Sequence, residues 1–169
     1  TGYVVARRMA TVSAKISRQL AVEAKDFGLM LIDAPMTGGQ IGAEQGTLTI
    51  MCGGREKAVE AARPIMAAYA RKIVHVGPTG HGQLTKMVNQ VTFVGIIASL
   101  AESLRFAQAA ELDLEQVFES ISGGAASSWQ MLNRWHTMAN DEFDFGFAVD
   151  WMRKDLGLAF DEARQNGAT

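Results

Sequence analysis

The spacing of apolar residues changes once along the chain, and this change limits the possible folds more than any other feature. Before Gly77, short segments with strand spacing alternate with segments of helical spacing, and after Gly82 only helical spacing recurs. Strands are predicted at 29–32, 47–51 and 72–76, and helices at 13–27 and 56–71. The alternation is typical of an α/β layer. The sequence therefore predicts an α/β domain over residues 1–79 and an all-α domain over residues 80–169.

The second half opens with a long apolar segment. Apolar residues from Leu84 to Leu104 cover much of the circumference of a helix, so this helix is predicted to be buried on several sides. Shorter helices are predicted at 114–122, 128–138 and 147–165, separated by Gly123-Gly124 and by the acidic turn at 140–142. The long helix would therefore connect the two domains.

Composition excludes several classes of protein. Of 169 residues, 48% are hydrophobic, and 16 basic residues balance 18 acidic ones, which argues against disorder and against a nucleic-acid partner. The single Cys52 excludes an internal disulfide and fits a reducing cytoplasm. We find no secretory signal and no unbroken apolar run of about 18 residues, so a soluble, cytoplasmic protein without a membrane partner is expected. The acidic residues at 141–144 are interpreted as a solvated turn, and no metal site is predicted.

A glycine-rich stretch, DAPMTGGQIGAEQGT, follows the first predicted strand at residues 33–47. Its four glycines allow the backbone to approach a ligand closely, so that successive amides converge on an anion such as a carboxylate. Thr37 would add a hydroxyl donor. A glycine-rich hairpin turn is the structural alternative, and the stretch itself leaves both interpretations open.

Three polar residues interrupt the long apolar helix on one face. Lys86, Asn89 and Gln90 stand at positions i, i+3 and i+4. A lysine held among apolar neighbours loses hydration, its pKa falls, and it can exchange a proton near neutral pH. A neighbouring amide can orient the oxygen that is protonated. The alternative is a lysine whose side chain extends along the helix to solvent.

Several motifs recur together in an order that resembles the β-hydroxyacid dehydrogenase family, which includes 3-hydroxyisobutyrate dehydrogenase and tartronate semialdehyde reductase. They are DAPMTGG, GTLTIMCGG, GHGQLTKMVNQ, SGGAASSW and FGFAVDWMRKDLGLA, between about Met9 and Gly167. Phosphogluconate dehydrogenases are similar but carry histidine at the position of Asn89, and imine reductases generally lack the lysine. The resemblance implies an oxidoreductase that transfers a hydride between NAD or NADP and a small 3-hydroxy acid of the hydroxyisobutyrate or tartronate semialdehyde type.

The resemblance also implies roles for individual residues. Thr37, Gly38 and Gly39 match the segment that binds the substrate carboxylate. Lys86 matches the catalytic acid/base of the family, and Asn89 the residue that orients the substrate.

Three further residues match positions near the nicotinamide cofactor. They are Thr11 in MATVS, Lys154 in the KDL motif, and Phe147, which would help to close the cleft. The sequence does not choose between NAD and NADP, because the residues that read the ribose lie in a part of the family pattern that this sequence does not contain.

One part of the family pattern is not found. Family members open with a strand, a GxGxxG turn and a helix, and Thr1–Arg8 does not match that strand. We therefore expect the carboxyl-terminal remainder of a Rossmann-type sheet with uncovered edges, followed by the long helix and a helical domain. A homo-oligomer formed through the long helix at 83–110 is expected. The alternative function is a catalytically silent remnant that serves as an oligomerisation or binding module.

Overall fold

The computed structural model describes residues 5–168, which pack into two compact units. The first unit contains the residues up to Gln90 together with those from Gly146 onward, and the second comprises Val91–Phe145. The helix α4, His81–Ala109, runs through both units. The packing thus divides the chain within this helix, whereas the sequence pattern changes ahead of it, at residue 79.

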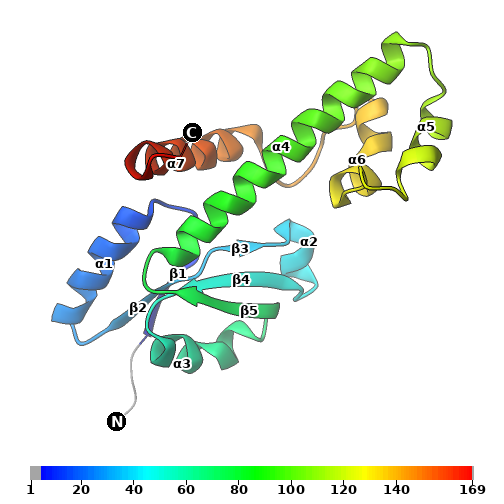
Figure 1. The fold of residues 1–169 in the computed structure, drawn as a ribbon. Helices are drawn as coiled ribbons and strands as arrows, with labels where there is room; N and C mark the ends of the chain where they lie inside the picture. Colours follow the sequence, from blue (N-terminus) through cyan, green and yellow to red (C-terminus); the bar gives the residue numbers. More distant parts are fainter. Residues whose placement is uncertain (1–4, 169) are drawn as a thin grey trace. The chain divides into compact units, whose positions relative to one another are not determined.

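The first unit is built on a mixed sheet (Figure 1). Its strands are β1 (Val5–Arg8), β2 (Met30–Asp33), β3 (Met36–Thr37), β4 (Leu48–Gly53) and β5 (Ala70–Gly77). The order is β1-β2-β4-β3, with β5 also paired to β4. The pairs β1–β2 and β4–β5 are parallel, and β2 and β3 are antiparallel to β4.

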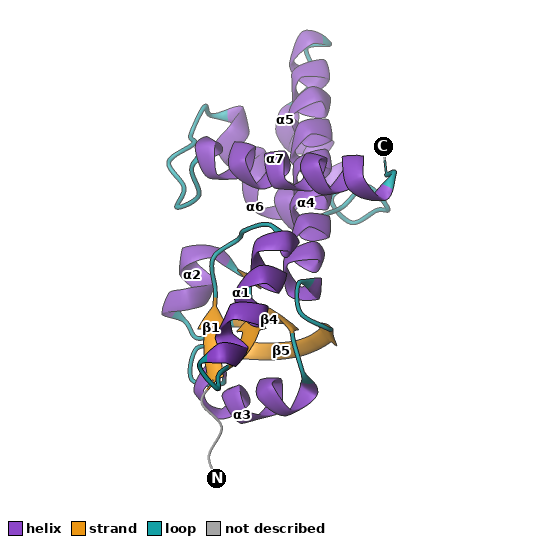
Figure 2. Cartoon of the chain, turned by 90° about the vertical axis from the view of Figure 1, so that its left-hand side faces the viewer, coloured by secondary structure: helices purple, strands orange, loops and turns teal. Residues whose placement is uncertain are grey.

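Four further helices belong to this unit: α1 (Ala14–Asp26), α2 (Gly39–Glu44), α3 (Glu56–Met66) and α7 (Val149–Asn166). Figures 1 and 2 show α3 on one side of the sheet and the first turns of α4 on the other. The predicted cap of α1 is confirmed, because the Ser13 hydroxyl accepts a hydrogen bond from the Ile16 amide at 3.1 Å.

The core of the first unit lies between β2, β4 and α3. Its fully buried apolar residues include Ile32, Ile50, Cys52, Val59 and Met66. The helix predicted at 56–71 is shorter in the structure, so its predicted end at residue 71 is wrong. The chain leaves the helix after Met66, and Ala70 already pairs with Leu48 at the start of β5. Ending the helix early lets Tyr69 and Ala70 pack against the core, which outweighs their helical propensity.

The beginning of the chain also differs from expectation. Val5–Arg8 forms a strand in parallel register with Met30–Asp33, although Thr1–Arg8 did not match a family strand. Residues 1–4 lie outside the described part. These four residues do not alternate strongly between apolar and polar, and they form a strand because β2 lies beside them. The pairing could therefore not be seen in the sequence.

The second unit is helical. It contains the later turns of α4 with α5 (Leu114–Ile121) and α6 (Trp129–Ala139). Leu100, Leu104, Met131 and Trp135 form its buried core, and the Trp135 indole donates a hydrogen bond to the Leu114 carbonyl at 3.1 Å. The predicted helices are confirmed in place and type.

The long helix α4 is less buried than the sequence predicted. By length and composition it could cross a membrane, but the core helix of a soluble protein satisfies the same criterion. Only 22% of its most apolar window is buried in this chain. Burial on several sides is therefore wrong for the single chain.

Cys52 is expected to resist thiol reagents while the protein is folded. It is fully buried beside the Met66 sulfur, and burial raises the pKa of its thiol to about 11. The thiol therefore stays protonated and shielded well above neutral pH. Labelling with iodoacetamide at pH 8 should proceed only in denaturant. Complete labelling of the native chain within minutes would contradict this placement.

Candidate active site

Lys86 lies on α4 in the first unit, and its side chain is buried, with 9% of the residue exposed. Burial lowers the pKa of the Lys86 amine, because the charged form loses hydration. The negative charge of Asp155 opposes this shift, and the positive charge of Lys154 adds to it. The alternative of a lysine extended to solvent is therefore excluded by the structure.

Asp155 on α7 is the buried charge that faces this part of α4. Only 2% of the residue is exposed. Its Oδ2 accepts a hydrogen bond from Gln90 Nε2 at 2.7 Å, and its Oδ1 lies 2.8 Å from Lys154 Nζ. Gln90 Oε1 in turn accepts from Asn89 Nδ2 at 2.8 Å. A chain of polar contacts thus joins Asn89 to the carboxylate and ties α7 to α4.

Lys154 connects the same carboxylate to the segment before α1. Its Nζ donates to the Thr11 carbonyl at 2.9 Å, and its side chain remains 42% exposed. The structure therefore brings Thr11, Lys154, Lys86 and Asn89 into one network of contacts and charges. Asp155 completes it. Asp155 had no predicted role, although an acid directly after the matched lysine on a predicted helix was visible in the sequence.

Thr37, Gly38 and Gly39 stand where β3 passes into α2. Thr37 pairs with Thr49 on β4, and the two glycines have φ angles of 126° and 62°, which favour glycine. A Cβ on Gly38 would lie 3.0 Å from Leu48 Cδ2. The stretch is thus neither an open loop nor a tight hairpin turn, because a short helix follows the glycines. Both glycines are exposed.

Phe147 lies in the segment that precedes α7, two residues ahead of the helix, and 48% of it is exposed. The neighbouring Gly146 lies against Gln40 of α2, since a Cβ there would come within 2.7 Å of Gln40 Oε1. The segment that carries Phe147 therefore lies beside the helix that begins at Gly39.

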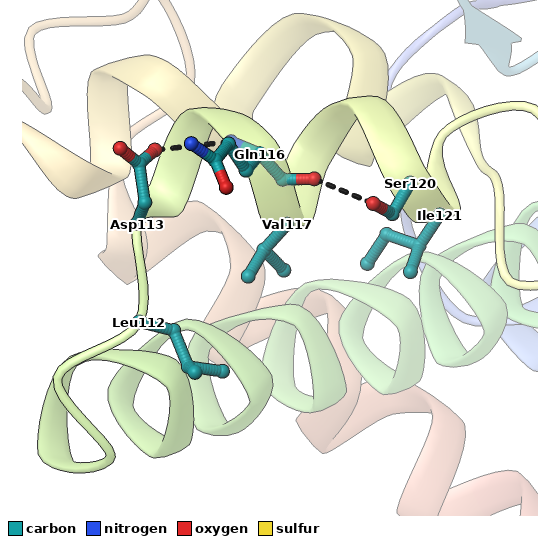
Figure 3. A pocket seen from close by; sticks show the side chains of 6 residues that line it. All are labelled: Leu112, Asp113, Gln116, Val117, Ser120 and Ile121. Atoms are coloured by element: carbon teal, nitrogen blue, oxygen red, sulfur yellow. Dashed lines mark hydrogen bonds between the residues drawn. The ribbon is translucent and has the colours of Figure 1, made fainter.

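A hollow of about 260 Å³ in the second unit is formed by other residues (Figure 3). Its lining comes from Leu112, Asp113, Gln116, Val117, Ser120 and Ile121. The Asp113 carboxylate already accepts from the Gln116 amide, and the Ser120 hydroxyl donates to the Gln116 carbonyl. These polar groups serve the helix itself, and none of the matched residues lines this hollow.

Comparison with known proteins identifies the class. Residues 80–169 match the family described as "NAD-binding of NADP-dependent 3-hydroxyisobutyrate dehydrogenase". Residues 3–77 match the "NAD binding domain of 6-phosphogluconate dehydrogenase". The fold and these matches are those of the class of nicotinamide-dependent oxidoreductases. More closely, the chain belongs to the β-hydroxyacid dehydrogenase family, whose members are NAD(P)-dependent 3-hydroxyacid dehydrogenases.

Individual relatives agree with this assignment. An uncharacterized oxidoreductase of Shewanella frigidimarina is 51% identical over 94% of this chain and 54% of its own length. The NAD-dependent L-serine dehydrogenase of Pseudomonas aeruginosa is 32% identical over 94% of this chain and 56% of its own. A structure of Mycobacterium tuberculosis 3-hydroxyisobutyrate dehydrogenase with L-serine superposes with a TM-score of 0.89 at 32% identity, covering 98% of this chain and 59% of that one. The chain spans about half the length of the curated relatives it matches.

The residues present fit the nicotinamide end of such a cofactor. The carboxamide of nicotinamide needs hydrogen-bond donors and acceptors. A lysine ammonium has three donors, and that of Lys154 donates to the Thr11 carbonyl, pairs with Asp155 and lies 5.9 Å from the centre of the Trp151 ring. The Thr11 hydroxyl is a further candidate donor and acceptor. The chemistry of this donor set therefore agrees with the cofactor of the family.

The pKa of Lys86 is expected to depend on Asp155. In the parent it should lie below the ordinary value of 10.5, Asp155→Asn should lower it further, and Lys154→Met should raise it. Because the folded chain releases this proton first, the free energy of unfolding should rise, relative to Lys86→Met, as pH increases from the folded pKa toward 10.5. NMR titration of 13C-labelled lysine side chains measures these values.

Asp150→Asn is the matched control, since Asp150 is an exposed carboxylate on the same helix. It should leave the titration of Lys86 nearly unchanged. An Asp155→Asn variant with the parental Lys86 pKa would show that the buried carboxylate does not act on this amine.

Proposed function

We propose that this chain carries the proton-transfer and substrate-binding residues of a dehydrogenase acting on a small 3-hydroxy acid, with Lys86 as the general acid/base. The observation that carries the proposal is the buried amine of Lys86, whose pKa is lowered by burial and which faces a network joined to Asp155. A pKa closer to neutral allows the group both to accept and to release a proton.

The reaction follows from these positions. Neutral Lys86 takes the proton of the substrate hydroxyl during oxidation, and the ammonium form returns it to the carbonyl oxygen during reduction. Asn89, held by Gln90, orients that oxygen. The Thr37 hydroxyl and the amides of Gly38 and Gly39 bind the carboxylate. When bound, NAD or NADP supplies the hydride acceptor or donor.

Three residues act at the cofactor. Lys154 and Thr11 hold the nicotinamide end, and Lys154 is itself anchored by Asp155. Phe147, half exposed and next to Gly146, which lies against Gln40 of α2, helps to close the cleft beside the cofactor. These three roles require that this chain binds the cofactor.

The substrate class is a small acid with a hydroxyl on its β carbon, of the hydroxyisobutyrate or tartronate semialdehyde type. The relatives support it, because L-serine is also such an acid: it stands in the name of the Pseudomonas aeruginosa dehydrogenase, and the Mycobacterium tuberculosis structure is one with L-serine. A cytoplasmic location is part of the proposal and rests on the single thiol, Cys52.

Replacing Lys86 should remove the proton-transfer step and spare the fold. Lys86→Met is expected to lower turnover of a 3-hydroxy acid by roughly 10²- to 10⁴-fold, the usual contribution of a general acid/base. Initial rates of NADH or NADPH formation measure it, after fluorescence titration has shown which cofactor the chain binds. Lys72→Met, at an exposed lysine of β5, is the matched control and should keep parental rates.

Two outcomes would contradict the proposal. Near-parental turnover of Lys86→Met would refute the role of this amine. Absence of any fluorescence change at millimolar NADH and NADPH would show that this chain alone is no enzyme, and would favour a binding or oligomerisation module.

We also propose that copies of the chain associate through the long helix at 83–110. Val91 and Phe106 on α4 are 53% and 74% exposed, and the helix buries little of its apolar surface within one chain. A second copy that presents the same helix would cover such a surface.

Charged residues on this surface should separate the copies. The parent is expected to run as a dimer or larger species in size-exclusion chromatography with light scattering, and Val91→Glu/Phe106→Glu as a monomer. Phe160→Glu, at an aromatic residue of α7 that is 59% exposed, is the control and should keep the parental mass. A monomeric parent at all accessible concentrations would exclude this association.

A further inference from the structure

We propose that Gln83 is a positioning residue, which fixes the segment Ala10–Val12 and thereby sets Thr11 relative to the helix turn that carries Lys86. The inference rests on the proposed function, since its purpose is to place the nicotinamide end of the cofactor beside the proton-transfer group. No motif role was predicted for Gln83, although it stands in GHGQLTK.

Both the oxygen and the nitrogen of the Gln83 side-chain amide make hydrogen bonds. The residue is fully buried, with 0% exposure. Its Oε1 accepts a hydrogen bond from the Val12 amide at 3.0 Å, and its Nε2 donates to the Ala10 carbonyl at 2.9 Å. These two contacts bracket Thr11. One primary amide thus replaces the two-point pairing that a neighbouring strand would give this segment.

The backbone of Gln83 is itself held by a buried carboxylate. Asp33, at the end of β2 and fully buried, accepts from the Gly80 amide at 2.7 Å and from the Gln83 amide at 3.0 Å. It therefore caps the start of α4 from a distant strand. Asp33 thus ties the backbone of Gln83 to the sheet, and this fixes the position from which the Gln83 side chain extends.

The bracketed segment is also held from the opposite helix. The Thr11 carbonyl accepts from Lys154 Nζ, so α4 and α7 grip three successive residues together. Gln83 precedes Lys86 by three positions, about one helical turn. Removing the Gln83 side-chain amide would therefore release Thr11 while the helix turn that carries Lys86 stays in place, which is what a positioning role requires.

Only an amide of this length supplies both a donor and an acceptor here. Gln83→Met keeps the approximate volume and removes both hydrogen bonds. Gln83→Glu keeps an acceptor for the Val12 amide but places a carboxylate against the Ala10 carbonyl. Ser17→Ala is the matched control, because Ser17 is a fully buried polar residue on α1 whose hydroxyl makes no hydrogen bond in the described structure.

The first measurement is amide hydrogen exchange at Val12, which needs no cofactor. Gln83→Met should speed this exchange about fivefold to tenfold relative to neighbouring α1 amides, as expected for the loss of a buried hydrogen bond. Gln83→Glu should keep most of the protection, and it replaces Gln83→Met in the test if that variant does not fold. Unchanged exchange in Gln83→Met would overturn the clamp. For the Glu variant, which loses only the Ala10 contact, a cofactor affinity equal to that of the parent would overturn the positioning role.

The second measurement separates positioning from general stability. Gln83→Met should raise the dissociation constant of NADH or NADPH about fivefold to tenfold, while the affinity for a small carboxylate inhibitor and the Lys86 titration stay parental. Faster Val12 exchange with unchanged cofactor affinity would overturn the positioning role. A parent that binds neither cofactor overturns the proposed function and, with it, the cofactor part of this inference. In that case exchange at Val12 still decides whether the clamp exists.

Discussion

The arrangement of the candidate site depends on one buried carboxylate, that of Asp155. A buried charge is costly unless it is paired and hydrogen-bonded. Asp155 meets this requirement with Gln90 and Lys154, and in doing so it fastens α7 to a helix 65 residues earlier in the chain. The same charge limits how far burial can lower the pKa of Lys86. One residue thus serves both the packing of the unit and the chemistry of its amine.

A second buried carboxylate, that of Asp33, explains why two positions of the family motifs, 53 and 82, are glycine. A Cβ on Gly53 would lie 2.5 Å from Asp33 Oδ1, and one on Gly82 would lie 2.7 Å from Asp33 Oδ2. Glycine at both positions lets Asp33 reach the first amides of α4. The first glycine of MCGG and the second glycine of GHG are therefore required by packing at the start of the helix, whatever ligand the site binds.

Much of the fold follows from local patterns in the sequence. The cap at Ser13, the strand that ends at Asp33, and the placement of Lys86 with Asn89 on one helix face all depend on residues within a few positions of each other. The features that were missed depend on distant partners: Val5–Arg8 needs β2, and Asp155 and Gln83 act on residues 65 and more positions away. Such pairings are set by the folded chain as a whole, and a single sequence does not display them.

The two lysines of the site differ for a physical reason that their sequence neighbours do not reveal. Lys154 keeps contact with solvent, and its ammonium is held by a carboxylate and a backbone carbonyl. Lys86 is buried, and its pKa falls because hydration is lost. A group fixed by partners is suited to hold a ligand, whereas a group with weakened hydration is suited to exchange a proton. Burial and partners thus give two identical side chains different physical properties.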